Sequence, residues 1–197
     1  MTERTLLGIV GSVSADSRTR TAVKVALDAA ADTHDVDTAV LHLADYNLAT
    51  ADGRGINHEG DTADALELIV EADAYVVGTP VYRGSYSGAL KNLLDMVPRG
   101  EWQGDVAPFE NAAVGLVATG ATDHHFLAVD QELRPAFAFF GAHTVGGATY
   151  ASGDDFADGE LVDEGVGDRL ATLGGATVEL AAAIDESAAL GSLGPAV

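Results

Sequence analysis

The chain has 197 residues, of which 47% are hydrophobic, which is enough for one well-buried core and too few for two full-sized domains. It contains no cysteine, and this excludes disulfides, iron–sulfur clusters, thiolate zinc sites and a cysteine nucleophile. With 31 acidic residues against 10 basic ones the formal net charge is −21, so the charge excludes nucleic acid as an expected partner.

Apolar runs and helical patterns alternate along the chain. Strands are predicted at residues 6–10, 38–43, 74–78, 112–118 and 143–150. Helices are predicted at residues 18–31, 61–72, 87–96, 125–139 and 166–186. Five strands, each followed by a helix, indicate a single α/β domain over residues 1–187, built on one parallel sheet with helices on both faces. Residues 188–197 are expected to form a frayed C-terminal tail.

The first predicted strand runs into a loop rich in hydrogen-bond donors. This loop carries four hydroxyl side chains and two arginines: Ser12, Ser14, Ser17, Thr19, Arg18 and Arg20. Hydroxyls, arginine and the free amides of a helix N-terminus are the donors that a phosphate needs. The alternative is that Ser17 only caps the helix while the other residues line a turn. Two arginines at one strand end of so acidic a chain favour phosphate.

The same loop excludes two common nucleotide motifs. It matches neither G-x-G-x-x-G nor G-x-x-x-x-G-K-[ST], so the dinucleotide fingerprint and the ATP-type phosphate loop are both missing from this strand end.

The third and fourth predicted strands also end in polar loops that contain glycine. Residues 78–91 hold two tyrosines and two serines, and residues 118–125 read Ala-Thr-Gly-Ala-Thr-Asp-His-His. The carboxyl ends of parallel strands share one edge of a sheet, so all three loops should meet there. One loop suited to phosphate and two loops with small residues, tyrosine and free amides fit a phosphorylated planar heterocycle. FMN is the common ligand of that shape.

The adjacent histidines His124 and His125 suggest a metal ion at first sight. Neighbouring side chains of a helix point about 100° apart, so both do not easily bind one ion, and we predict no metal site. Lys91 and Asp95 stand four residues apart on the third predicted helix. Their simplest interpretation is an ion pair on the helix surface or at an interface.

The acidic residues are spread along the chain and form no tail or single patch. A docking face for a basic partner would need such a focus, so we interpret the charge as a source of solubility. Few lysines together with dispersed acid are typical of proteins adapted to concentrated salt, where the Debye length falls to about 3 Å. We therefore expect a halophilic source and a fold that needs salt. The first residues lack a signal-peptide pattern, which predicts a cytoplasmic protein.

Three ordered motifs carry a family resemblance. They are Gly11-Ser12-x-Ser14-x-x-Ser17-Arg18, then Thr79-Pro80-Val81-Tyr82-x-x-x-Tyr86-Ser87-Gly88-Ala89-Leu90-Lys91, then Thr119-Gly120-x-Thr122-x-x-His125-x-Leu127-Ala128-Val129-Asp130. Over residues 6–155 the chain resembles the NAD(P)H-dependent FMN reductases, and most of all the branch that supplies reduced flavin to alkanesulfonate monooxygenases. Members of that branch carry an aromatic residue or histidine at a local irregularity of the fourth helix, where this chain has Gln131. Release or retention of reduced FMN is therefore left open.

The resemblance implies a flavodoxin-like three-layer sandwich with a five-stranded parallel sheet in the order 2-1-3-4-5. It implies FMN as the cofactor, with the phosphate held by Ser12, Ser14, Ser17, Arg18 and Thr19. The ring would lie against Pro80, Val81, Tyr82 and Ser85 on one side and Thr119, Gly120 and Ala121 on the other. It also implies a homodimer or homotetramer formed through the helices after strands three and four, and a flavin-dependent monooxygenase as a partner.

The activity that the resemblance implies is hydride transfer from NADPH or NADH to N5 of FMN, with the electrons passed to a flavin-dependent partner or a small acceptor. The protein would stack and orient the reactants, so no catalytic residue is assigned. Two other functions stay open: a quinone or azo-compound reductase with tightly bound FMN, and a flavodoxin-type electron carrier. The arginines of the first loop and the Tyr-Ser-Gly-x-Leu-Lys motif favour a reductase over the carrier, and the intact polar loops disfavour a binding module that has lost its flavin.

Overall fold

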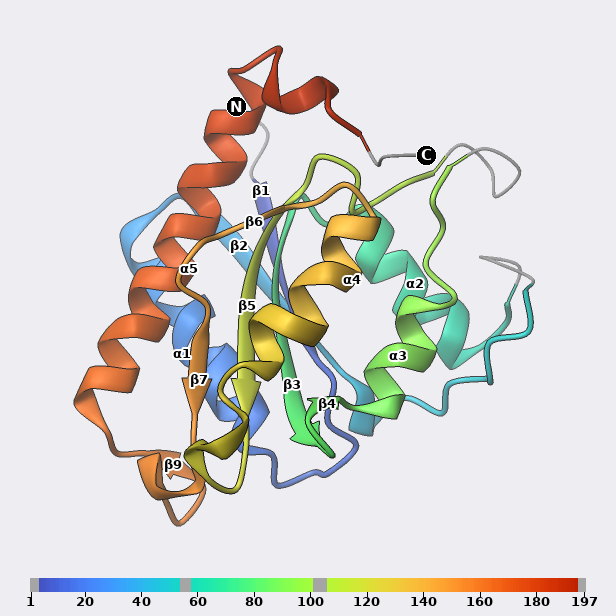
Figure 1. Ribbon diagram of the computed structural model, residues 1–197. Helices are drawn as coiled ribbons and strands as arrows, with labels where there is room; N and C mark the ends of the chain where they lie inside the picture. Colours follow the sequence, from blue (N-terminus) through green and yellow to red (C-terminus); the bar gives the residue numbers. More distant parts are fainter. Residues whose placement is uncertain (1–3, 54–57, 101–105, 195–197) are drawn as a thin grey trace.

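A parallel sheet stands at the centre of the molecule (Figure 1). The computed structural model describes residues 4–53, 58–100 and 106–194. The main strands are β1 (Arg4–Val10), β2 (Val36–His42), β3 (Ala74–Tyr82), β5 (Ala113–Thr119) and β6 (His143–Thr144). They lie in the order β2-β1-β3-β5-β6 and all pair in parallel. The expected flavodoxin-like order 2-1-3-4-5 is confirmed.

The fifth position of the sheet is shared by two short strands. β6 pairs with the start of β5, and β7 (Thr149–Ala151) pairs with its end. Between them the chain passes through Gly146 and Gly147, and Gly147 has a φ of 72°, which favours glycine and cannot continue a strand. The single strand predicted at residues 143–150 is therefore two strands separated by a glycine bend.

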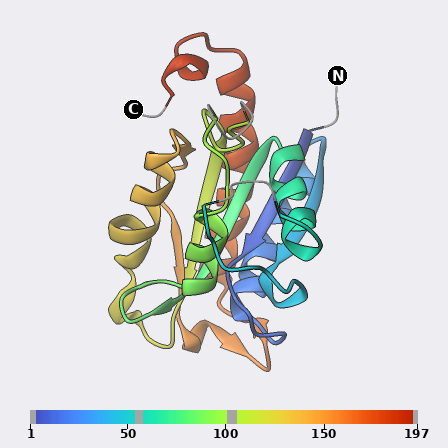
Figure 2. The same ribbon diagram turned by 90° about the vertical axis from the view of Figure 1, so that its right-hand side faces the viewer.

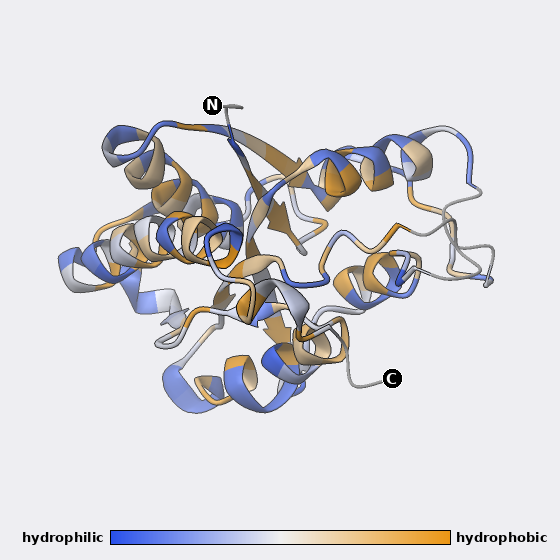
Figure 3. Ribbon diagram, turned by 90° about the horizontal axis from the view of Figure 1, so that it is seen from above, coloured by the Kyte–Doolittle hydropathy of each residue, from blue (hydrophilic) through white to orange (hydrophobic). Residues whose placement is uncertain are grey.

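Helices cover both faces of the sheet (Figures 1 and 2). One face packs against α1 (Arg18–Thr33) and α5 (Glu164–Asp185), and the other packs against α2 (Asp61–Glu71), α3 (Gly88–Leu94) and α4 (Arg134–Phe139). In β1 the side chains alternate between the two cores, with Leu6 facing α1 and α5 and Leu7 facing the other three helices. Seen from above, hydrophobic strands lie between helices that turn hydrophilic sides outward (Figure 3). The three-layer sandwich is thus the architecture that buries both faces.

The two helices of the first layer approach each other closely. Gly174 of α5 faces Ala26 of α1, and a Cβ atom at position 174 would lie 2.0 Å from the backbone oxygen of Ala26. The helices can pack at this distance only because residue 174 has no side chain. In the described part of the chain, no helix is long and apolar enough to cross a bilayer.

The fourth predicted helix is broken into three pieces. A turn of 3₁₀-helix, η3 (Asp123–His125), precedes a π-helical turn, η4 (Val129–Leu133), and only then does α4 begin. Pro135 lies in the first turn of α4. It has no N–H for the carbonyl four residues earlier, at Gln131, and its ring crowds that carbonyl, so the helix widens before it. The irregularity that the resemblance implied near Gln131 is present.

The structure contains two antiparallel hairpins that were not predicted from the sequence. β4 (Ser85–Tyr86) folds back onto the end of β3, and β8 (Phe156–Ala157) pairs with β9 (Glu160–Leu161). Both turn through two residues with positive φ, Arg83 and Gly84 in the first and Asp158 and Gly159 in the second. Each hairpin lies at the carboxyl edge of the sheet, where ligands of such folds bind.

The C-terminal segment folds back onto the domain. After α5, the short helix η6 (Leu190–Ser192) places the Leu190 carbonyl 2.8 Å from Nε2 of His143. The Gly194 amide donates to Oδ1 of Asn111 at 3.1 Å. The expected fraying is therefore not seen up to Gly194, and residues 195–197 of the predicted tail lie outside the described residues. The domain boundary at residue 187 stays a prediction.

Candidate functional site

The loops after β1, β3 and β5 meet around one cavity of about 420 Å³. Its volume falls in the range of small-molecule sites. We call it the strand-end cavity, and its lining consists of Ser12, Ser14, Asp16, Ser17, Arg18, Thr19, Pro80, Val81, Tyr82, Thr119, Gly120 and Ala121. Eleven of the twelve residues proposed from the sequence are among them, and Ser85 is not. The sheet thus brings together three segments that are far apart in the chain.

The first loop supplies the polar end of the cavity. Ser17 is the N-cap of α1, and its hydroxyl oxygen accepts a hydrogen bond from the Arg20 amide at 3.2 Å. A hydroxyl can accept and donate at once, so this capping bond leaves the O–H of Ser17 available to a ligand. Capping and ligand binding, the two alternatives for this residue, are therefore compatible. Ser12 is buried, and its Oγ accepts from the Ser14 amide at 3.2 Å.

Arg18 is an exposed side chain at the rim of the same polar end. Its guanidinium carbon lies 6.0 Å from the centre of the Phe156 ring, at the edge of the range for a cation–π contact. In the described part of the chain it makes no ion pair, whereas Arg4, Lys24, Lys91 and Arg134 each pair with a carboxylate. Arg18 therefore brings to the cavity a guanidinium that is not held in an ion pair, although the cavity lining also includes Asp16.

Buried hydroxyl groups tie the three loops to one another. Thr19 and Thr119 join the first and third loops through their hydroxyls, 2.6 Å apart. Ser87, the N-cap of α3, joins the second loop to the first, because its Oγ donates to the Gly11 carbonyl and its amide donates to Oγ1 of Thr79 at 3.0 Å. These contacts fix the walls of the cavity relative to one another.

The second loop supplies a flat wall that is mostly apolar. Pro80 and Val81 are half-buried near the end of β3, and Tyr82 is 59% exposed beside them. Beyond the Arg83–Gly84 turn the chain leaves the cavity, because Ser85 Oγ donates to Oε2 of Glu132 in η4 at 3.1 Å. The sequence could not locate this turn, since its first residue is an arginine where asparagine or aspartate is usual.

The third loop is held by a residue that the sequence analysis missed. Tyr150 donates its hydroxyl to the Thr122 carbonyl at 2.5 Å, and a Cβ atom at position 120 would lie 1.9 Å from the Tyr150 oxygen. A side chain at position 120 would therefore displace the Tyr150 hydroxyl. Burial, with Asp123 and Asp155 nearby, raises the pKa of Tyr150, so the hydroxyl keeps its proton and remains a donor. Only the pairing of β7 with β5 brings Tyr150 here, and no local pattern signals it.

The two neighbouring histidines, His124 and His125, lie next to each other on η3. Within the described residues, no three His, Asp or Glu side chains gather as ligands. His124 Nδ1 lies 3.0 Å from Oγ1 of Thr122, and both histidines are exposed on η3.

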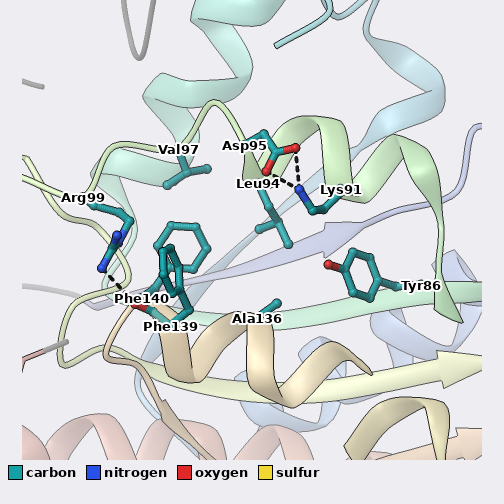
Figure 4. Close-up of a pocket in the computed structure, with 9 residues that line it drawn as sticks. All are labelled: Tyr86, Lys91, Leu94, Asp95, Val97, Arg99, Ala136, Phe139 and Phe140. Carbon is teal, nitrogen blue, oxygen red and sulfur yellow. Dashed lines mark hydrogen bonds and ion pairs between the residues drawn. The ribbon is translucent and has the colours of Figure 1, made fainter. Parts of the chain in front are cut away.

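A second cavity of about 460 Å³ lies between α3 and α4 (Figure 4). Its walls include Leu94 and Ala136, and Lys91 pairs with Asp95 on α3 at its rim. Phe139 is 61% exposed, and the Arg99 guanidinium lies 3.8 Å from the centre of its ring. This α3–α4 cavity is separate from the strand-end cavity and lies on the surface that the resemblance assigned to subunit contacts.

Comparison with known proteins gives three findings. The family model described as "NADPH-dependent FMN reductase" matches residues 4–157. An NAD(P)H-dependent FAD/FMN reductase of Geobacillus thermodenitrificans is 36% identical over 170 residues, which cover 85% of this chain and 88% of that protein. The NADH-dependent FMN reductase SfnF of Pseudomonas putida is 41% identical over 117 residues, 57% of this chain and 59% of that protein.

A solved structure supports the fold. A crystal structure of the NADH:FMN oxidoreductase EmoB in its apo form superposes with a TM-score of 0.74 at 24% identity, over 95% of this chain and 93% of that one. At this level of identity the likeness concerns the arrangement of helices and strands.

Proposed function

Because this chain belongs to the NADPH-dependent FMN reductase family, we propose that it is an oxidoreductase that uses NADPH or NADH to reduce FMN. The family model covers most of the domain, from β1 to β8, and therefore all three loops of the strand-end cavity. The observation that carries the proposal is that cavity, in which a polar end and a flat, mostly apolar wall meet at the carboxyl edge of a parallel sheet.

The strand-end cavity has the donors and the shape that FMN needs. We assign the phosphate to Ser12, Ser14, Ser17, Arg18 and Thr19, where hydroxyls, an unpaired guanidinium and the N-terminus of α1 coincide. The ring belongs against Pro80, Val81 and Tyr82 on one side and Thr119, Gly120 and Ala121 on the other. The missing side chain at Gly120 leaves room for the Tyr150 hydroxyl, which bonds to the Thr122 carbonyl and holds this wall in place. Ser85 is not part of this assignment.

When bound, FMN supplies the group that accepts hydride at N5 from the nicotinamide. The residues of this chain hold that ring between two walls and keep its phosphate in place, so their contribution is orientation and exclusion of water. Hydride transfer needs no general acid or base. A cavity with walls of mainly hydroxyl, aromatic and aliphatic side chains therefore fits a reductase, and we assign no catalytic residue.

The electrons go on to a flavin-dependent partner, such as a monooxygenase, or to a small acceptor. Gln131 bears on this step, because it is exposed in the π-helical turn η4, next to Glu132, whose carboxylate bonds to the β3–β4 hairpin beside the cavity. The amide side chain of Gln131 would contact an aromatic ligand more weakly than an aromatic side chain at this position would. We propose that flavin exchange at this site depends on residue 131.

A second copy of this chain is the proposed occupant of the surface around the α3–α4 cavity. Three large apolar side chains are exposed between η3 and the end of α4, namely Phe126, Leu127 and Phe139. Large apolar side chains exposed along one segment favour an interaction surface there. The assembly would be a homodimer or a homotetramer.

The proposed setting is the cytoplasm of a halophilic organism. A reductase of this kind draws hydride from the cell's reduced nicotinamide nucleotides. The net charge of −21 on 197 residues favours a medium that screens self-repulsion.

The experiment that tests the proposed function begins with purification in molar KCl. Binding of added FMN is expected to change the fluorescence of the flavin, and NADPH or NADH should be oxidised when FMN is present. Parallel assays with each nucleotide give the specificity, and assays with and without added FMN tell released flavin from retained flavin. A protein that binds no FMN and oxidises neither nucleotide would overturn the proposal.

A further inference from the structure

His42 is a buried histidine directly behind the first loop. It is the last residue of β2 and pairs with Val10, the residue from which the loop leaves β1. Its side chain is only 1% exposed, and neither ring nitrogen makes a hydrogen bond to any described residue. Buried polar groups without a partner are rare in folded proteins, and each one calls for an explanation.

Few charged groups act on this ring. Asp45 of η1 (Leu43–Asp45) lies on one side, with Oδ2 3.8 Å from Nδ1 of His42. Arg20 of α1 also acts on the ring, as does the backbone of Ser14 and Ser12. Burial is the main influence and lowers the pKa of His42, and Arg20 adds to this effect. Asp45 and the backbone of Ser14 and Ser12 oppose it. Without a ligand, burial therefore favours the neutral ring.

We propose that His42 is a positioning residue for the flavin phosphate, and that it takes up a proton from solvent when that phosphate binds to the first loop. This inference rests on the proposed FMN site. A phosphate held by the loop of Ser12 and Ser14 brings negative charge to the side opposite His42, and a nearby opposite charge favours the protonated ring. It also offsets the positive charge of Arg20.

The protonated ring would satisfy groups that have no partner now. Both nitrogens of an imidazolium are donors, so one N–H can bond to the Asp45 carboxylate and the other to a backbone oxygen of the loop. A loop held from behind through its carbonyl groups keeps its amide and hydroxyl donors for the ligand. The charge on the ring strengthens binding of the phosphate and does not involve the flavin ring system.

The first test follows the histidine resonances by NMR as pH is varied, with FMN, riboflavin or inorganic phosphate added. FMN and inorganic phosphate should move the titration of His42 to higher pH, whereas riboflavin, which has no phosphate, should leave it in place. His42→Gln identifies the resonance. His34→Gln is the matched control, because His34 lies at the opposite end of α1. A His42 titration that FMN does not move would overturn the proposal without involving any variant.

The second test compares affinities. Relative to His42→Gln, the wild type should bind FMN equally near pH 8.5 and progressively more tightly as the pH falls, with a limit of about tenfold at low pH if binding moves the titration by one pH unit. Comparison at equal pH cancels the titration of the phosphate itself. A loss of riboflavin affinity equal to the loss of FMN affinity would mean a purely structural role and overturn the proposal. Absence of FMN binding to the wild type would instead overturn the proposed function.

Discussion

Arg18 stands where the strand-end cavity meets the segment that leads into the β8–β9 hairpin, with its guanidinium near the Phe156 ring and Gly153. Replacing it by alanine should weaken FMN binding by about tenfold to a hundredfold, because hydrogen bonds to charged groups contribute about 1.5–3 kcal/mol. Riboflavin affinity should hardly change. Hydride transfer in the saturated enzyme should fall much less than affinity. Fluorescence titration of the flavin measures both affinities.

Arg169→Ala is the control for Arg18→Ala. Arg169 is an exposed arginine on α5, so this variant changes the net charge equally at a different place. Its FMN affinity should equal that of the wild type. An unchanged FMN affinity in Arg18→Ala would refute the assignment of the phosphate to the first loop.

His42 also gives stability a pH dependence in the absence of ligand. Burial lowers its pKa below the usual value of 6.5, which the unfolded chain regains. As the pH falls below that value, the unfolded state binds a proton that the folded state does not, so the free energy of unfolding decreases. Urea titrations from pH 8 to about pH 5 at fixed KCl concentration should show this loss in the wild type. Equal pH dependence in His42→Gln would contradict it.

Most residues of the strand-end cavity were predictable because they follow strand ends directly. The sheet order then brings Ser12, Pro80 and Thr119 to one place. Ser85 was misplaced because the hairpin turn at Arg83 and Gly84 has no clear sequence signal. Tyr150 was missed because its contact with Gly120 depends on the pairing of distant strands.

At the scale of elements, the contact between α1 and α5 leads to a prediction that opposes helix propensity. Gly174→Ala should destabilise the protein by about 1–3 kcal/mol, although alanine favours helix, because the new Cβ would overlap the backbone oxygen of Ala26. Gly167→Ala in the same helix meets only the side chain of Leu161 at 3.8 Å. It should be neutral or stabilise by up to about 1 kcal/mol. Denaturant unfolding of both variants measures the contrast, and equal effects would contradict it.

The elements that the sequence predicted well are those with long, uniform patterns. β1, β3, α1 and α2 lie where apolar periodicity put them, give or take a few residues. The fourth helix and the fifth strand were wrongly predicted as continuous elements, because Pro135 and Gly147 interrupt them locally. The Asp158–Gly159 turn is a sequence signal for a hairpin that could have been recognised beforehand.

For the whole molecule, the net charge of −21 predicts a dependence on salt. The melting temperature should rise by about 5 °C or more between dilute buffer and molar KCl. This follows if screening of the repulsion between like charges raises the free energy of unfolding by about 2 kcal/mol in a protein of this length. NaCl at equal ionic strength should have a similar effect, because screening depends on ionic strength. A melting temperature independent of KCl would contradict the expected adaptation to salt.

If the proposed assembly forms, a substitution at one surface residue should lower the mass of the particle in solution. Phe139→Asp introduces a charge on the surface around the α3–α4 cavity and should convert the assembly to smaller species in light scattering after size-exclusion chromatography. Val162→Asp, which changes an exposed apolar residue after β9, should leave the mass unchanged. A wild type that is monomeric at micromolar concentration would exclude the assembly.

The hydroxyls of Thr19, Thr119 and Ser87 have a consequence for the speed of flavin turnover. Their buried hydrogen bonds connect the three loops, so the framework of the strand-end cavity is formed without a ligand. Little conformational entropy is then lost on binding, and none of these loops has to reorganise when a flavin leaves. At the proposed FMN site, the residence time of the flavin would then be set by the strength of its own contacts, so single substitutions at the rim should change the rate of exchange while the framework of the cavity stays as it is.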